Sequence, residues 1–371
     1  PGSAEAGDQI VLVDYARTWG TYKIVIDSNG LNYQGEDDSY GVEYNTSGAT
    51  LNIVYSGASK GWTPISDDVV TDAPVAPPTQ KAIFAFGFVN AGSETNVSNL
   101  VSSNGTVGND VTGVGTARTY FCGASYGSDK GIMAFGGALT GANKTGVSNL
   151  ISNQGVVASD TSAVGTARLN PGAAGFGTTG QAIFAYGSSA SGNSTIVNFI
   201  SNSGVVASDS SGAGTARNNP EGARYGVGLA IMAYGDTGSN TNISNKISSS
   251  GVIASDTSGV GTARTGLGGT SYGGDKAIFA YGTGDTNISN LVSNTGVVSS
   301  DVSGVGTARN NVAGTNYGGD LGLFGYGLSG STNQNMTNKV SNQGVVASDT
   351  TGVGTATTPL LDIKFTIVEL P

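Results

Sequence analysis

The sequence predicts an almost entirely β protein in which a small antiparallel module precedes a six-bladed β-propeller. Three observations support this prediction. Between residues 82 and 357 the chain repeats one pattern six times, with a period near 50 residues. Each copy contains short β-branched and aromatic runs bounded by Gly, Asn, Asp and Ser, which is typical of strands and turns. Apolar residues at helical spacing are essentially absent. A period near 50 with several short strands per copy indicates a propeller.

The first 66 residues read as a separate unit. Apolar runs at Ile10–Val13, Lys23–Ile26 and Leu51–Tyr55 predict strands, and Ser-Asn-Gly and Thr-Ser-Gly turn sequences separate them. Three prolines then favour an extended, semi-rigid linker. Because Pro1 already lies inside what reads as a folded module, we expect the chain to be a fragment or a processed product. The predicted parts are a small β module (1–66), a Pro-rich linker (67–80) and the propeller (81–371).

Each later copy opens with an apolar run that ends in glycine, such as Ala277–Gly282, and later reaches a Gly-Thr-Ala-Arg element. An aspartate precedes the arginine position by eight residues in all six copies. Length variation is concentrated in the loop that directly follows the glycine. Loops that vary on a constant scaffold often select binding partners. The arginines are Arg118, Arg168, Arg217, Arg264 and Arg309, and Thr357 takes the sixth position.

Small residues lie five positions after each arginine and an aromatic residue lies eight positions after it. This pattern predicts an innermost strand, where bulky side chains near the axis would crowd. The first copy begins at its second strand and lacks an innermost strand of its own. We therefore expect residues 358–368, which include Phe365 eight positions after Thr357, to supply that strand. Such a strand would close the ring and leave no unpaired sheet edge.

A unit such as Gly261–Arg264, followed by a small-residue strand, a turn and Ala277–Gly282, resembles the kelch motif. The resemblance covers about three quarters of the chain. Kelch repeats carry two glycines where this sequence has one, and the kelch tryptophan is absent, since Trp19 and Trp62 both lie in the first unit. The resemblance implies that the arginine starts the innermost strand and that the second strand ends in glycine.

Charge and composition exclude several classes of function. The net charge is −10, and residues 1–80 hold eleven acidic and three basic residues of that total. A basic surface that follows nucleic-acid phosphates is therefore not expected. The single cysteine, Cys122, excludes an intrachain disulfide framework. No run is long and apolar enough to predict membrane insertion.

Histidine is absent, which removes Ser-His and Cys-His nucleophiles and the commonest metal ligand. Six-bladed propellers include sialidases, and Arg217, Glu221 and Tyr225 lie close enough in sequence to raise that reading as a minor alternative. A polysaccharide-degrading spike would need paired carboxylates, which the sequence does not offer. Asp with Ser and backbone oxygens suits calcium, but no copy has two close carboxylates. We expect no enzymatic activity and no cofactor, with calcium as the alternative.

The arginines have two interpretations. They could form a positive ring at one mouth of the channel that binds an anionic glycan or carboxylate. Alternatively, each arginine bonds the aspartate of its own copy or carbonyls of a neighbouring copy and holds a turn, which the constant spacing favours. The candidate ligand face comprises the five arginines together with Asn143, Lys144, Asn193, Asp236 and Asp285.

The first unit resembles a module of bacteriophage tail fibres and related virion proteins. The matching residues are Gly7–Ile10, Asp14–Tyr15, Asn29–Gly30 and Leu51–Trp62, about one sixth of the chain. The resemblance implies a virion appendage, often a homotrimer, that carries the propeller at its far end. We therefore expect a structural protein that contacts other virion proteins and binds a host-surface receptor, glycan in the first instance. A capsid decoration or cement protein and a bacterial surface adhesin are the alternatives.

Overall fold

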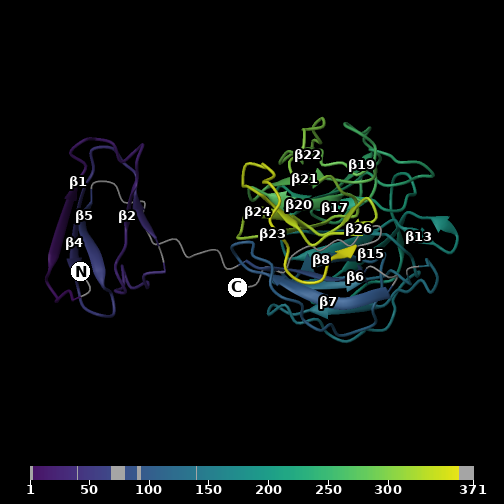
Figure 1. Ribbon diagram of the computed structural model, residues 1–371, viewed down its shortest axis with the longest axis horizontal. Helices are drawn as coiled ribbons and strands as arrows, with labels where there is room; N and C mark the ends of the chain where they lie inside the picture. Colours follow the sequence, from purple (N-terminus) through teal and green to yellow (C-terminus); the bar gives the residue numbers. More distant parts are fainter. Residues whose placement is uncertain (1–2, 40, 68–79, 90–92, 139, 359–371) are drawn as a thin grey trace. The chain divides into compact units, whose positions relative to one another are not determined.

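The computed structural model describes residues 3–39, 41–67, 80–89, 93–138 and 140–358. These residues form strands, turns and short bridges and contain no helix, so the all-β prediction is confirmed. Internal contacts divide the chain into two compact units, Pro1–Pro78 and Thr79–Pro371. The division falls inside the stretch 67–80 that the prolines mark as a linker. Figure 1 shows both units.

Unit 1 contains two antiparallel sheets. Strands β1 (Gln9–Val13), β4 (Thr50–Tyr55) and β5 (Trp62–Asp67) pair in the order β1-β4-β5, and β2 (Ile24–Ile26) pairs with β3 (Val42–Tyr44). Alternate side chains of β4 are buried, which is why one face of this strand contributes Leu51 and Ile53 to the core. The three predicted strands are present. Strands β3 and β5 are additional; neither has an apolar run as long as those of the predicted strands, since β3 reads Val-Glu-Tyr and β5 contains Pro64.

The described residues of unit 2 form six antiparallel sheets that each contain at least three strands. Figure 1 labels most of these strands. In five of these sheets the strands pair in chain order. The first contains β8 (Cys122–Tyr126), β9 (Lys130–Ala134) and β10 (Ser148–Ile151), and the second contains β11 (Gly172–Phe176), β12 (Gln181–Ala185), β15 (Ile196–Ile200) and the short β16 (Ser210–Ser211). The other three are β17 (Glu221–Tyr225) with β18 (Leu229–Ala233) and β19 (Ser244–Ile247); β20 (Gly268–Tyr272) with β21 (Lys276–Ala280) and β22 (Ser289–Val292); and β23 (Ala313–Tyr317) with β24 (Leu321–Gly325) and β27 (Thr337–Val340). The sixth sheet has the order β28 (Thr357–Thr358), β6 (Ala82–Val89), β7 (Ser93–Val101). Two small hairpins, β13 (Ser188–Ser189) with β14 (Gly192–Asn193) and β25 (Leu328–Ser329) with β26 (Thr332–Asn333), lie in loops.

Glycine is required in the first strands of these sheets by close backbone approach. The strands β8, β11, β17, β20 and β23 contact one another in chain order. A Cβ added at Gly222 of β17 would overlap the backbone oxygen of Ala173 in β11, and one at Gly314 would overlap the backbone of Gly269. The small residues five positions after each arginine therefore have the steric reason that the sequence predicted.

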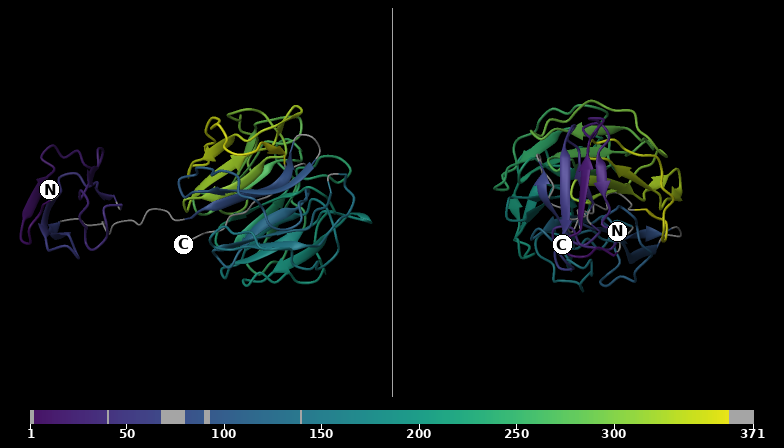
Figure 2. Two further views of the ribbon diagram at one scale, coloured as in Figure 1. Left: turned by 60° about the horizontal axis from the view of Figure 1, so that its bottom comes forward. Right: turned by 90° about the vertical axis from the view of Figure 1, so that its left-hand side faces the viewer.

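Contacts between neighbouring sheets continue past the last repeat and return to the first. Aromatic pairs join successive repeats, such as Tyr234 with Phe279 and Tyr281 with Phe324, and Tyr326 of the last repeat packs on Phe84 of the first with ring centroids 5.1 Å apart. One core cluster contains residues of both the first and the last repeat. Figure 2 accordingly shows the last sheet, in yellow, beside the first, in blue.

The end of the repeat region pairs with its beginning. Thr357 and Thr358 of β28 lie antiparallel to Val89 and Phe88 of β6. The other repeats make the equivalent contact, as Thr119 does with Gly137. The predicted closing strand at 358–368 lies outside the described residues from position 359 onward.

Candidate functional site

Each arginine of the repeat lies inside the protein. Arg118 donates from Nε to the backbone oxygen of Phe135 at 2.9 Å, from one terminal nitrogen to Thr116 O at 3.2 Å, and from the other to Asn149 Oδ1 at 2.7 Å. Arg264 and Arg309 repeat this pattern, and Arg168 and Arg217 keep parts of it. The five side chains are at most 2% exposed. Burial lowers the pKa of Arg118 to about 10, although nearby Asp160 opposes this shift, so the guanidinium stays charged at pH 7.

Each guanidinium is covered by an aromatic ring that lies in or directly after the second strand of the preceding sheet. Arg168 lies 3.8 Å from the ring centroid of Phe135, and Arg217 lies 4.1 Å from that of Tyr186. This aromatic residue directly precedes the glycine that ends the apolar run of its repeat. It adopts a positive φ, which is 67° at Phe135 and 65° at Tyr186. A bulky residue in this region is strained and persists only when its surroundings hold it. The cation–π contact and the buried ring supply that support.

An aspartate and an asparagine complete a polar cluster in every repeat, which we call the clamp. In the second repeat, Asp160 accepts from Thr116 N at 3.1 Å and from Asn149 Nδ2 at 2.8 Å. Burial alone would raise the pKa of Asp160, but the hydrogen bonds from Thr116 and Asn149 outweigh it, so the pKa lies below its usual value. The clamp aspartates, all shifted in this direction, are Asp110, Asp160, Asp209, Asp256, Asp301 and Asp349.

The arginine's acidic neighbour differs from the one expected from sequence spacing. Arg118 lies 4.0 Å from Asp160, which follows it in the chain, and Arg309 lies 3.8 Å from Asp349. The aspartate eight residues before Arg118 is Asp110, which instead accepts from Thr355 N at 3.0 Å and so ties the last repeat to the first. The constant spacing of eight therefore reflects the connection between two successive clamps and not a contact within one.

The arginines do not present an open positive ring in this structure. Their guanidinium groups are enclosed by backbone oxygens, asparagine side chains and aromatic rings, and Arg118 also contributes to the lining of a cavity that is described below. The contacts favour the interpretation in which the arginine holds a turn, with Asn149 and its equivalents as additional partners. The sequence carried a signal for these asparagines, because each lies eleven residues before its clamp aspartate in all six copies.

The other residues of the candidate ligand face lie in the variable loops, and most of them contact the next repeat. Lys144 Nζ donates to the backbone oxygen of Ser189 at 2.7 Å. Asn193 Nδ2 donates to the backbone oxygen of Asp236 at 2.9 Å. Asp285 accepts from Asn310 Nδ2 and from Gly330 N. These contacts fix each loop against its neighbour, so Lys144, Asn193 and Asp285 act first as connectors between repeats.

Asn143 lines a cavity of about 300 Å³ between the first two repeats. The cavity also contacts Glu94, Thr116, Arg118 and Thr145. Asn143 is exposed and has a φ of 53°. The remaining predicted residue, Asp236, accepts from Gly238 N at 2.6 Å and thereby closes its own loop. The structure thus brings Asn143 and Arg118 to one cavity and leaves Asp236 in a separate turn.

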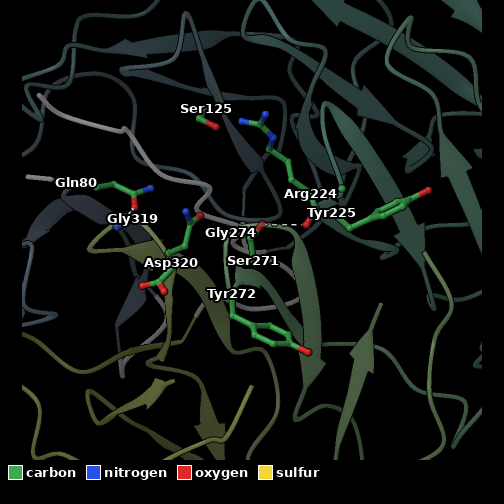
Figure 3. A pocket seen from close by; sticks show the side chains of 11 residues that line it. Gln80, Ser125, Arg224, Tyr225, Ser271, Tyr272, Gly274, Gly319 and Asp320 are labelled. Carbon is green, nitrogen blue, oxygen red and sulfur yellow. Dashed lines mark hydrogen bonds between the residues drawn. The ribbon is translucent and has the colours of Figure 1, made fainter. Parts of the chain in front are cut away.

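A second cavity, of about 120 Å³, lies where the ends of the first strands of several repeats meet (Figure 3). Its lining includes Ser125, Arg224, Ser271 and Asn316, each seven residues after an arginine of the repeat, and also Gln80. Our sequence prediction did not include this pocket. The sequence does contain one indication of it. Arg224 is the one charged residue among those that lie seven positions after the five arginines.

The described part of the chain contains no group of three or more Asp, Glu, Cys or His residues placed to hold a metal ion. Within the same residues, no helix is long and apolar enough to cross a membrane. Cys122 is buried, and a buried thiol packs as a small apolar residue.

Comparison with known proteins gives no family assignment. No protein-family model matches the chain, and no curated protein matches it.

Proposed function

We propose that residues 81–371 form a six-bladed, kelch-like β-propeller that is closed by the C-terminal strand. The observation that supports this proposal is that contacts between successive repeats recur between the last repeat and the first. Asp110 binds Thr355 as the other clamp aspartates bind their threonines, and Tyr326 packs on Phe84. The pairing of β28 with β6 has the register that would carry the following residues along the inner edge of β6. In this arrangement six sheets surround one axis.

We propose that the protein is a non-enzymatic structural component of a phage particle. The resemblance of Gly7–Ile10 and Leu51–Trp62 to the tail-fibre module carries this proposal. Unit 1 would attach to other virion proteins, in a homotrimer, and the propeller would face outward. The virion is the corresponding location. The alternatives remain a capsid decoration protein and a bacterial surface adhesin.

The propeller is suited to present polar loops to a host-surface receptor. Hydrogen bonds such as Lys144 to Ser189 and Asn193 to Asp236 hold the loop bases against the next repeat. Loops held in this way lose little conformational entropy on binding. Exposed hydroxyl and amide groups can exchange hydrogen bonds with sugar hydroxyls, so glycan is the proposed receptor. Three copies in a trimer would raise weak binding through avidity.

Electron microscopy with gold-labelled antibody against residues 81–371 tests the location on particles that carry the protein. Label at fibre tips or at the tail end would support receptor binding. Label distributed over the head would overturn this proposal in favour of capsid decoration. Absence from particles, with the protein on a bacterial surface, would point to an adhesin.

Loop replacement tests the receptor-binding face. Residues 137–144 and 188–195 would be exchanged for short Gly/Ser turns, and adsorption of the resulting particles would be compared with that of unaltered ones. We expect adsorption to be lost while the circular dichroism of the purified chain is retained. Because Lys144 reaches the next repeat, a variant that keeps Lys144 and replaces only 137–143 serves as the matched control for folding. Unchanged adsorption would contradict the proposed face.

A further inference from the structure

The pocket of Figure 3 contains two side chains, Arg224 and Gln80, with hydrogen-bond donors that have no acceptor among the described residues. The Arg224 side chain makes no hydrogen bond or ion pair with any described residue, unlike the five clamp arginines. Gln80 is 6% exposed, and its Nε2 is buried without a hydrogen-bond partner among the described residues. Its Oε1 is occupied, since it accepts from Gly319 N at 2.5 Å. A buried donor without an acceptor lowers the stability of the folded state. A ligand with acceptor atoms would therefore be stabilised in this pocket.

The fold fixes both donors in place. Arg224 is the fourth residue of β17, and Ser271 Oγ donates to its backbone oxygen at 3.0 Å. A Cβ added at Gly175 would lie 3.2 Å from Arg224 Cδ, so glycine in the preceding repeat leaves room for the arginine stem. Gln80 is held at two points, because its backbone oxygen accepts from Gly318 N at 3.0 Å and its Oε1 accepts from Gly319 N. Figure 3 shows both side chains extending into the pocket.

The remaining lining suits a small polar group. Ser125 contributes a hydroxyl that is mostly buried, and Asn316 contributes an amide. Asp320 also lines the pocket, and in Figure 3 its carboxylate points away from the Arg224 guanidinium. The Ser125 hydroxyl and the Asn316 amide are neutral groups that can donate hydrogen bonds. A cation with several neutral donors matches the charge and the acceptor geometry of an oxyanion.

We propose that this pocket binds a small oxyanion, a carboxylate or phosphate group, through Arg224 and Gln80. The lining includes Gly226, Gly274 and Gly319 from the turns that follow β17, β20 and β23, so the pocket lies at the opposite strand ends from the clamp arginines and their loops. The proposed occupant is a free anion from solution. This inference does not depend on the virion assignment.

Isothermal titration calorimetry on the full chain tests the proposal, with inorganic phosphate and acetate as probes and sodium chloride at matched ionic strength as the blank. We expect saturable binding to the unaltered chain. Arg224→Gln should weaken binding at least about tenfold, which one charge-assisted hydrogen bond accounts for. Gln80→Ala should weaken it less. Lys246→Gln, which removes one charge from an exposed lysine that donates to Thr295 O, is the matched control and should bind as the unaltered chain does.

Equal affinity of the unaltered chain and Arg224→Gln would overturn the proposal. Absence of saturable binding of both phosphate and acetate to the unaltered chain would overturn it as well. Circular dichroism confirms folding of each variant, and Arg224→Gln should fold because its side chain makes no hydrogen bond with described residues.

Discussion

Replacing one clamp arginine should destabilise unit 2 severely and leave unit 1 unchanged. In Arg264→Ala the backbone oxygen of Tyr281 and Oδ1 of Asn290 lose donors at 2.7 Å each, and the ring of Tyr234 loses its cation. Each buried acceptor left without a donor costs about 1–3 kcal/mol. Allowing for partial relaxation, we expect the free energy of unfolding of unit 2 to fall by about 3–5 kcal/mol, the range found when one partner of a buried charged pair is removed.

The chain contains a built-in reference for this measurement. Both tryptophans, Trp19 and Trp62, lie in unit 1, so tryptophan fluorescence during urea unfolding follows unit 1 alone. Far-ultraviolet circular dichroism follows both units. Arg264→Ala should move the circular dichroism transition of unit 2 to lower urea and leave the fluorescence transition in place. Arg264→Lys should recover little, because an ammonium cannot reproduce the planar fork. A change of less than about 0.5 kcal/mol in unit 2, the usual effect of a surface substitution, would refute the structural role of the guanidinium.

Three further predictions concern the repeat region. The clamp aspartates have folded-state pKa values below the usual one. The stability that they contribute should therefore be complete above about pH 5 and should fall as the pH drops through about 4 toward the folded pKa values. Urea midpoints measured by circular dichroism at pH 7, 5, 4 and 3 check this prediction, and a midpoint that does not change with pH would contradict it. Gly222→Ala should destabilise unit 2 by about 1–3 kcal/mol through overlap with Ala173 O, whereas Gly108→Ala, where the added carbon meets only an atom at 3.4 Å, should cost much less. A double-mutant cycle on Asp110→Ala and Thr355→Val should give a coupling energy of about 1 kcal/mol if the last repeat binds the first, and a coupling of zero would mean that the repeat region is open.

The sequence was sufficient for the main strands and for the repeat, and it also favoured a turn-holding role for the arginines. Regular spacing located the strands, because glycine and aromatic positions recur in every copy. The same spacing paired Arg118 and its equivalents with the aspartate eight residues before them, which is not the acidic neighbour that the structure shows. Only coordinates show that Asn149 and Asp160, 31 and 42 residues after Arg118, enclose the guanidinium. Side-chain burial depends on contacts between strands that are distant in sequence, and spacing alone does not report them.

The connector residues show a second limit of inference from residue type. Lys144, Asn240, Asp285 and Asn333 occupy one position of the repeat and differ in charge, which in isolation suggests a variable recognition surface. Each nevertheless contacts the following repeat: Lys144 reaches Ser189 O, Asn240 reaches Thr283 Oγ1, Asp285 accepts from Gly330 N, and Asn333 reaches Phe88 O.

A backbone peptide offers both a donor and an acceptor, so a lysine, an amide or a carboxylate can serve as connector at the same place. The residue at this position can therefore vary while it still connects one repeat to the next, and its type does not indicate a ligand.

Arg224 shows the opposite case. Among the residues seven positions after the five arginines it is the one with a charge, and the described structure provides no internal acceptor for it. A departure from the repeat that leaves a charge without a protein partner is thus a stronger indicator of binding than variation that the neighbouring repeat accommodates.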